Sequence, residues 1–303
     1  MTSAERRFAG RLEDRSAVRS VRFDDFVATY VVDGILRMRP KGFFPAIPSH
    51  HWSARPELLT ADGELLMSVG GLLIERDDTV LLIDAGVGPA QFDFSVGSAD
   101  SGSMIDVLTD LGWRPERIDM VAITHLHFDH AGWLFANGAE TFPNARHVLA
   151  AQEWAPHGTG EHRADLTTPQ QVVSHLATKT TLELFDDGDE ILPGVRAIVT
   201  PGHSPGHTSY VITSQTGQRL IALGDAFHIP AQLAHPDWLS MADVDAEGVL
   251  TARRRLLGEL SQHNTVGFAF HFGDQAFGRV VTGDAGEPIW EPVETSVLAP
   301  PPR

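Results

Sequence analysis

A short segment at residues 124–132, which reads THLHFDHAG, constrains the fold of this chain more than any other. It places three imidazoles and one carboxylate within six residues. The segment before it, residues 120–124, is apolar and partly β-branched, which predicts a buried strand. Residues 131–136 can begin a helix. The cluster therefore lies at a strand-to-helix turn, where side chains leave a sheet and converge on one point.

The spacing within this cluster indicates metal binding. In an extended chain His125 and His127 project to the same side, so both imidazoles can reach one cation. Asp129 and His130 follow as the chain turns, and they are better placed for a second cation. Neutral imidazoles suit zinc and other borderline metals, and a carboxylate adds compensating charge. A solvated polar turn would need no imidazole, so we interpret the cluster as a metal site.

Four further motifs accompany this cluster along the chain. They are Leu-Ile-Asp-Ala-Gly at residues 82–86, the Pro/Gly-rich loop at residues 200–208, Leu-Gly-Asp at residues 223–225, and Ala-Phe-His-Phe-Gly at residues 269–273. In type and order, these motifs resemble those of the metallo-β-lactamase superfamily. The segment after Asp225 is similar to the branch that contains methyl parathion hydrolase and N-acyl homoserine lactonases. The segment after His271 differs from that branch, because it reads Phe-Gly-Asp where the branch usually has a proline-containing sequence.

The resemblance implies an α/β (α+β) fold, namely a four-layer αββα sandwich of two related halves. The sequence agrees, because strand-like runs alternate with helical runs in each half, and residues 82–86 and 220–225 end alike. No linker-like stretch separates two independent domains. We therefore predict a flexible arm at residues 1–17, a single domain at residues 18–295 and a disordered tail at residues 296–303.

The resemblance also assigns metal ligands residue by residue. It gives His125, His127 and His207 to one metal, gives Asp129, His130 and His271 to the other, and makes Asp225 and a water-derived hydroxide the bridges. The expected cofactors are two divalent ions, zinc first, with iron, manganese and cobalt as alternatives. We prefer His207 to His203 as the ligand because it sits where the loop enters the next strand, and we expect His203 to be structural. Asp84 ends a buried strand, and we expect it to hold the metal-site turn through backbone or imidazole N–H groups.

This ligand set predicts a dinuclear metal-dependent hydrolase. The bridging hydroxide would attack a carboxylic ester or lactone, and Asp129 would act as a proton shuttle. His228 and Trp133 are candidate substrate-binding residues. As alternatives, Trp133 lies in the core and His228 supports the site through a hydrogen bond.

Other functions are compatible with the same ligands. A phosphotriesterase or a β-lactamase would use the same site and differ in the shape of the pocket. An iron-bound redox enzyme is a further alternative, because histidine and aspartate also bind iron. A non-catalytic binding module that kept the fold belongs to a different class, and the intact ligand set argues against it.

The composition excludes several kinds of site and partner. The chain has no cysteine, which rules out disulfides, thiolate nucleophiles and cysteine-bound zinc. The net charge of −17 disfavours nucleic-acid partners, so we expect a small-molecule substrate. No apolar run approaches the ~18 residues of a membrane span, and residues 1–7 lead into charged sequence without the apolar core of a signal peptide. We therefore expect a cytoplasmic enzyme without membrane partners.

Residues 37–59 form the least regular segment, with four prolines, two phenylalanines and a tryptophan. We predict a long loop that serves as a lid or as a dimer contact, so that a homodimer would form through this loop or through the N-terminal arm. The alternative is that its aromatic side chains only fill the edge of the core. Three histidines without ligand spacing are expected at the surface: His157, His162 and His175.

Overall fold

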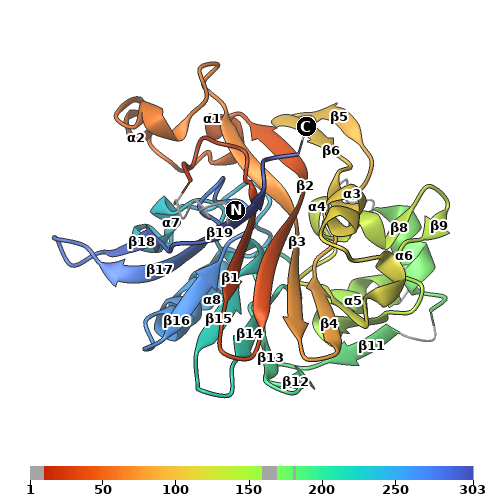
Figure 1. Cartoon of the computed structure of the whole chain (residues 1–303). Coiled ribbons are helices and arrows are strands. Elements are labelled where there is room, and N and C mark those ends of the chain that lie inside the picture. The colour runs from red at the N-terminus through yellow and green to blue at the C-terminus, as the bar shows by residue number, and fades with distance from the viewer. Residues whose placement is uncertain (1–9, 159–168, 180–181, 303) are drawn as a thin grey trace, which may run out of the picture.

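Two β-sheets pack face to face in the middle of the molecule, and helices cover their outer faces (Figure 1). This computed structural model describes residues 10–158, 169–179 and 182–302. The arrangement confirms the predicted αββα sandwich. Both sheets end at a common rim, and the predicted metal-site turn lies there.

The first sheet mixes antiparallel and parallel pairs. Its main path runs β11-β10-β7-β4-β3-β2-β1-β19, and the short strands β5 and β6 extend it beside β2. Its strands are β1 (Val18–Arg22), β2 (Val27–Met38), β3 (Leu65–Arg76), β4 (Thr79–Ile83), β5 (Gln91–Phe94), β6 (Gly97–Ser101), β7 (Met120–Ala122), β10 (Arg146–Ala150), β11 (Leu182–Phe185) and β19 (Ser296–Ala299). A tight turn joins β3 to β4, and Asp77 adopts a φ of 51° there.

The second sheet follows the order of the sequence, from β12 to β18. Its neighbours pair antiparallel except β15 and β16, which run parallel because helix α8 crosses between them. Its strands are β12 (Glu190–Leu192), β13 (Val195–Val199), β14 (Thr208–Thr213), β15 (Arg219–Ala222), β16 (Thr265–Phe268), β17 (Phe277–Thr282) and β18 (Pro288–Pro292). A separate two-stranded ribbon consists of β8 (Phe135–Ala136) and β9 (Ala139–Glu140).

Most helices are short, and α8 (Ala246–Leu260) is the long exception. The side chain of Asp245 caps its N-terminus by accepting a hydrogen bond from the amide of Glu247. The other helices are α1 (Pro40–Phe43), α2 (Ser49–Ser53), α3 (Met104–Asp110), α4 (Phe128–Ala131), α5 (Ala151–Gly158), α6 (Gln170–Leu176), α7 (Ala231–Ala234), and the 3-10 turns η1 (Pro56–Leu58), η2 (Pro115–Arg117), η3 (Gly132–Leu134) and η4 (Gly224–Ala226). None of the helices in the described ranges has both the length and the apolar character needed to cross a membrane.

Apolar side chains fill the spaces between these layers. One cluster lies between the sheets and joins Tyr30 of β2 to Phe268 of β16, with ring centroids 5.0 Å apart. A second cluster packs α3 and α6 against the outer face of the first sheet. A third packs α8 against the second sheet through Leu256 and Leu260. Burial of these side chains supplies most of the driving force for the fold and fixes the rim on which the site is built.

The two ends of the described chain meet at the edge of the first sheet. Strand β19 pairs antiparallel with β1, so the prediction of a disordered tail is wrong for Ser296–Ala299. The physical reason is that β1 would otherwise present an unpaired edge. Residues 1–9 of the predicted arm lie outside the described residues. Within residues 10–17, the amide of Ala17 donates to Asp274 at 2.8 Å and the carbonyl oxygen of Gly10 accepts from Gln275 at 2.8 Å, so both ends of this segment contact the folded domain. The flexibility of the arm stays a prediction.

Residues 37–59 fold over the rim instead of forming an open loop. The segment contains α1, α2 and η1, and Phe44 and Trp52 are buried in a fourth apolar cluster together with side chains of β2 and β3. Phe43 and Phe44 both place ring edges against the imidazole of His228. The segment therefore covers the site from one side.

Candidate metal centre

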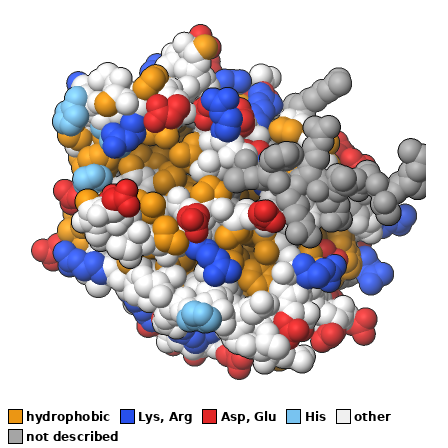
Figure 2. Space-filling model, turned by 60° about the vertical axis from the view of Figure 1, so that its left-hand side comes forward, with side chains coloured by type: hydrophobic (Ala, Val, Ile, Leu, Met, Phe, Trp, Pro, Cys, Tyr) orange, Lys and Arg blue, Asp and Glu red, His pale blue; other side chains and the backbone are white. Residues whose placement is uncertain are grey.

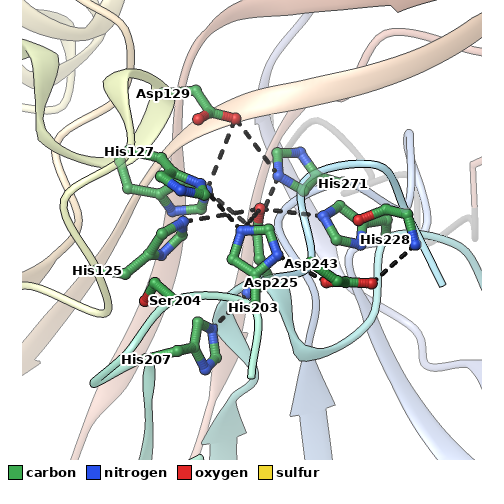
Figure 3. Close-up of polar contacts among 12 residues, drawn as sticks. His125, His127, Asp129, His203, Ser204, His207, Asp225, His228, Asp243 and His271 are labelled. Atoms are coloured by element: carbon green, nitrogen blue, oxygen red, sulfur yellow. Dashed lines mark hydrogen bonds and ion pairs between the residues drawn. The ribbon is translucent and has the colours of Figure 1, made fainter. Parts of the chain in front are cut away.

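Elements from both sheets deliver polar side chains to the common rim. Strand β7 leads into the turn that begins α4, the loop between β13 and β14 approaches from the second sheet, and β15 and β16 end beside it. All seven side chains that meet there are buried or nearly so. They are His125, His127, Asp129, His130, His203, Asp225 and His271. Figure 3 labels each of them except His130.

The ligand atoms of these side chains form two groups that share one carboxylate. The first group contains His125, His127, His203 and Asp225, and the second contains Asp129, His130, Asp225 and His271. Within each group the ligand atoms lie within 4.8 Å of one another. Two neighbouring clusters of nitrogen and oxygen donors of this size match the ligand types that zinc and related cations use.

Asp225 divides its two oxygens between the groups. Its Oδ1 lies 3.0 Å from Nε2 of His130 and 3.0 Å from Nε2 of His271. Its Oδ2 lies 3.3 Å from Nε2 of His203 and 3.9 Å from Nε2 of His125. The carboxylate therefore sits where a residue shared by two cations would have to sit.

The structure contradicts the expected choice between the two histidines of the loop at residues 200–208. His207 does not join the first group, because its Nε2 accepts a hydrogen bond of 2.8 Å from the backbone amide of Asp225. Its Nδ1 lies 2.8 Å from Oγ1 of Thr200, so both ring nitrogens are engaged. Gly224 permits this contact, because a Cβ at its φ of 56° would lie 2.4 Å from Nε2 of His207.

His203 takes the place that the sequence assigned to His207. Its Nε2 faces the first group, 3.0 Å from Nδ1 of His127. Its Nδ1 lies 2.9 Å from a carboxylate oxygen of Asp243, which orients the ring. Asp243 in turn lies 3.7 Å from the guanidinium of Arg253 in α8. Arg253 is fully buried, although it belongs to a run of three arginines, and such a run usually lies on a solvated face. His203 and Asp243 are 40 residues apart, and no local pattern in the sequence links them.

Asp84 makes the contacts that were expected of it. It is fully buried, and its Oδ1 accepts a hydrogen bond of 2.7 Å from the amide of Thr124. Its Oδ2 lies 2.7 Å from Oγ1 of Thr124 and 2.7 Å from Nδ1 of His130. Burial raises the pKa of Asp84, whereas these contacts favour the ionised form. Asp84 therefore aims Nε2 of His130 at the second group.

The electrostatics of the two groups differ. Burial lowers the pKa of His125 and His127 well below the usual value, and neighbouring imidazoles lower it further, so both rings are neutral and able to bind a cation. Burial also acts to lower the pKa of His130, but the carboxylates of Asp225 and Asp129 outweigh it and raise that pKa well above the usual value. A cation that binds the second group would therefore displace protons.

Unpaired nitrogen atoms fit a role of these residues in metal binding. Within the described part of the chain, the buried Nε2 atoms of His125 and His130 have no hydrogen-bond partner. The Nδ1 atom of each ring is already engaged, by Thr124 in one case and Asp84 in the other. Buried polar atoms without partners are costly, and coordination of a cation would remove that cost.

The two predicted substrate-binding residues, Trp133 and His228, do not line the apolar cavity that opens beside the second group. Trp133 lies in the core beneath α4, and its indole N–H donates a hydrogen bond of 2.7 Å to the buried carboxylate of Asp33. His228 lies inside the site, with Nε2 3.2 Å from Oδ2 of Asp225 and its ring parallel to that of His271. Trp133 therefore lies in the core, as its alternative described. Neither residue belongs to the cavity wall, and substrate binding by His228 stays a prediction.

A cavity of about 350 Å³ opens beside the second group. Figure 2 shows this face of the molecule, where apolar side chains line a hollow between charged ones. The wall includes Met67, Ile229 and Phe272, and His271 forms part of it. The cavity therefore connects an apolar space to a candidate metal ligand.

Three other histidines were expected at the surface. His175 is only partly exposed and lies 3.7 Å from a carboxylate oxygen of Glu140. His157 lies near the end of α5 with its ring 6.0 Å from that of Trp154. His162 lies outside the described residues. Neither of the two described residues belongs to the candidate metal groups.

Comparisons with known proteins find relatives along most of the chain. The family model of the metallo-beta-lactamase superfamily matches residues 71–260, more than half of the chain. An N-acyl homoserine lactonase of Bacillus thuringiensis is 28% identical over 224 residues, which are 69% of this chain and 83% of that protein. Two solved structures each cover 92% of this chain and 98% of their own, with TM-scores of 0.76. One is the hydrolase AbOPH of the beta lactamase superfamily (23% identical), and the other is the dizinc quorum-quenching lactonase AidC with its product N-hexanoyl-L-homoserine (21% identical).

Proposed function

Because the chain belongs to the metallo-β-lactamase superfamily, whose members include metal-dependent hydrolases, we propose that it is a dinuclear hydrolase of carboxylic esters or lactones. The expected cations are zinc, with iron, manganese or cobalt as alternatives, because the donors are imidazole and carboxylate alone. The expected substrate is a small molecule. The lactonase names of several relatives support the choice of an ester or lactone among the reactions of this fold.

The position of Asp225 carries the proposal of two cations. One of its oxygens faces His130 and His271, while the other faces His203 and His125. A single cation would leave one of these oxygens, with its imidazoles, unused in a buried site. When bound, two divalent cations would lower the pKa of a coordinated water and stabilise an anionic transition state.

Asp129 is the residue that we assign to proton transfer. It is 6% exposed, and its Oδ2 lies 3.6 Å from Nε2 of His271 and 3.7 Å from Nε2 of His130. A carboxylate at the edge of the second group can accept a proton from water and return it to the leaving oxygen. His228, next to Asp225, would orient the substrate from the opposite side.

The cavity beside His271 would accept the apolar part of the substrate. Its volume of about 350 Å³ and its apolar wall suit an acyl chain or an aryl group. His271 belongs both to the cavity wall and to the second group, so a substrate held there would present its reactive carbonyl to the metal centre.

A hydrolysis panel tests the proposal. Zinc-reconstituted protein would be assayed with lactones that carry acyl chains, aryl esters, phosphotriesters and β-lactams, with Asp225→Ala as the inactive control. We expect the highest kcat/KM for a lactone or ester and fewer than two zinc ions per chain in the control. Preference for phosphotriesters or β-lactams, or equal activity in the control, would contradict the proposal.

A further inference from the structure

One buried carboxylate outside the metal groups connects two of the loops that form the site. Glu153 lies in α5 and is 3% exposed. Its Oε1 accepts a hydrogen bond of 3.0 Å from the amide of Leu126. Its Oε2 accepts hydrogen bonds of 2.7 Å from Oγ of Ser204 and 2.8 Å from the amide of Gly206. The same carboxylate therefore joins segments that are about 80 residues apart in the sequence.

The positions of its donors relate Glu153 to the first group specifically. Leu126 lies between the ligands His125 and His127, and Ser204 directly follows the ligand His203. By contrast, His130 in the second group is oriented by Asp84, and Nδ1 of His271 lies 3.1 Å from a backbone carbonyl of β3.

The chain is shaped to permit this contact. A Cβ at Gly206 would lie 2.0 Å from the backbone nitrogen of Glu153, so only glycine allows the loop to pack directly on α5. Burial raises the pKa of Glu153, and its three donors favour the charged form. Burying a carboxylate costs desolvation free energy, and Glu153 makes no contact with the cavity. This combination implies that Glu153 serves to hold its three donors in place.

We propose that Glu153 is a positioning residue for the first cation site, where it holds the two loops that carry His125, His127 and His203 so that these imidazoles would face one cation. This inference rests on the proposed two-cation centre. Glu153 touches neither the cavity wall nor the candidate ligand atoms, so it acts through the loops. Partners of this kind typically change metal affinity by ~10–100-fold when they are replaced.

A double-mutant comparison tests the proposal. Zinc affinity would be measured by competition with a chelator for Glu153→Gln in two backgrounds. His271→Ala disrupts the second site, and His203→Ala disrupts the first. We expect Glu153→Gln to weaken zinc binding at least ~10-fold in the His271→Ala background and less than ~3-fold in the His203→Ala background. Equal weakening in both backgrounds, or none in either, would overturn the proposal.

Two further variants keep the test decisive. Glu183→Gln is the matched control, because Glu183 is exposed and pairs with Arg146 at the surface, and it should not change zinc affinity. If Glu153→Gln does not fold, as judged by circular dichroism, Ser204→Ala removes a single donor and should show the same selectivity with a smaller effect. Wild-type protein that fails to bind two zinc ions would contradict the proposed function. Two tightly bound zinc ions in both wild type and Glu153→Gln would contradict only the inference about Glu153.

Discussion

The backbone amide of Asp225 donates a hydrogen bond of 2.8 Å to Nε2 of His207, and His207 belongs to neither group of candidate metal ligands. The imidazole instead fixes the start of η4, from which the Asp225 side chain reaches both candidate cation groups. His207 thus supports the shared carboxylate of Asp225 by accepting a hydrogen bond from the Asp225 backbone. His203, four residues earlier, faces the first group instead.

Substitutions at these two histidines should have different effects on metal content. We expect His203→Ala to bind about one zinc ion per chain after desalting, because one imidazole of the first group is lost. We expect His207→Gln to retain two zinc ions and to lose only ~10–100-fold in activity, since it supports Asp225 indirectly. Metal content would be measured by mass spectrometry. Loss of a zinc ion from His207→Gln but not from His203→Ala would contradict the assignment.

Asp129→Asn should lower the turnover number by at least ~100-fold, because the substitution removes a charge from the second group and a candidate proton carrier. The measurement is steady-state kinetics on zinc-loaded protein with the best substrate of the panel. Asp110→Asn, at the exposed end of α3, is the matched control and should behave like wild type. Near-normal turnover of Asp129→Asn would exclude Asp129 from catalysis.

Arg253→Met should destabilise the fold strongly. The buried guanidinium donates hydrogen bonds to the carbonyl oxygens of Ala226, Pro236 and Trp238 and lies 3.7 Å from Asp243. Removing it leaves a buried carboxylate with fewer partners, and we expect the free energy of unfolding to fall by about 3–5 kcal/mol. Urea denaturation would measure this change. Arg254→Met, at the exposed neighbouring position, should change it by less than ~0.5 kcal/mol.

His147 should make stability depend on pH. Burial, followed by the nearby charge of Lys179, lowers the pKa of His147 to about 4. Between that value and the ~6.5 of an unfolded histidine, the unfolded chain binds more protons than the folded one, so stability falls as the pH falls through this window. The loss should reach roughly 3 kcal/mol at the bottom of the window.

Unfolding free energies measured from pH 7 to pH 4 would test this effect. His147→Leu should flatten the dependence, whereas His263→Leu, at an exposed position, should follow the wild-type curve. Parallel curves for wild type and His147→Leu would refute the prediction.

Filling the cavity should change substrate preference. Ala234 of α7 lines the cavity, and Ala234→Phe would occupy part of its volume. We expect kcat/KM for lactones with long acyl chains to fall at least ~10-fold, while that for short-chain lactones changes little. Ala177→Phe, at an exposed position after α6, is the control. An equal loss for short and long chains would indicate that the cavity does not bind the acyl group.

Local spacing accounts for much of what could be predicted. The turn at residues 124–132 follows a buried strand as expected, and Asp84 makes its expected contacts with Thr124 and His130. By contrast, Glu153 and Asp243 gave no signal. Glu153 is an isolated acidic residue in the sequence, whereas Asp243 is one of three acidic residues within 243–247. The site-loop partners of Glu153 are 27–53 residues away, and His203 is 40 residues from Asp243.

The sequence by itself determined which kinds of side chain gather at the rim, because strand ends and the spacing of His125 and His127 are local properties of the chain. It also determined where strands and helices alternate, since apolar periodicity is local as well, whereas the resemblance to a known family implied the two packed sheets. Only the tertiary structure decided between His203 and His207. Both lie in one irregular loop, and the choice depends on which ring nitrogen the backbone of Asp225 engages and which ring Asp243 orients. Contacts between segments that are distant in the chain carry that information, and no periodicity encodes them.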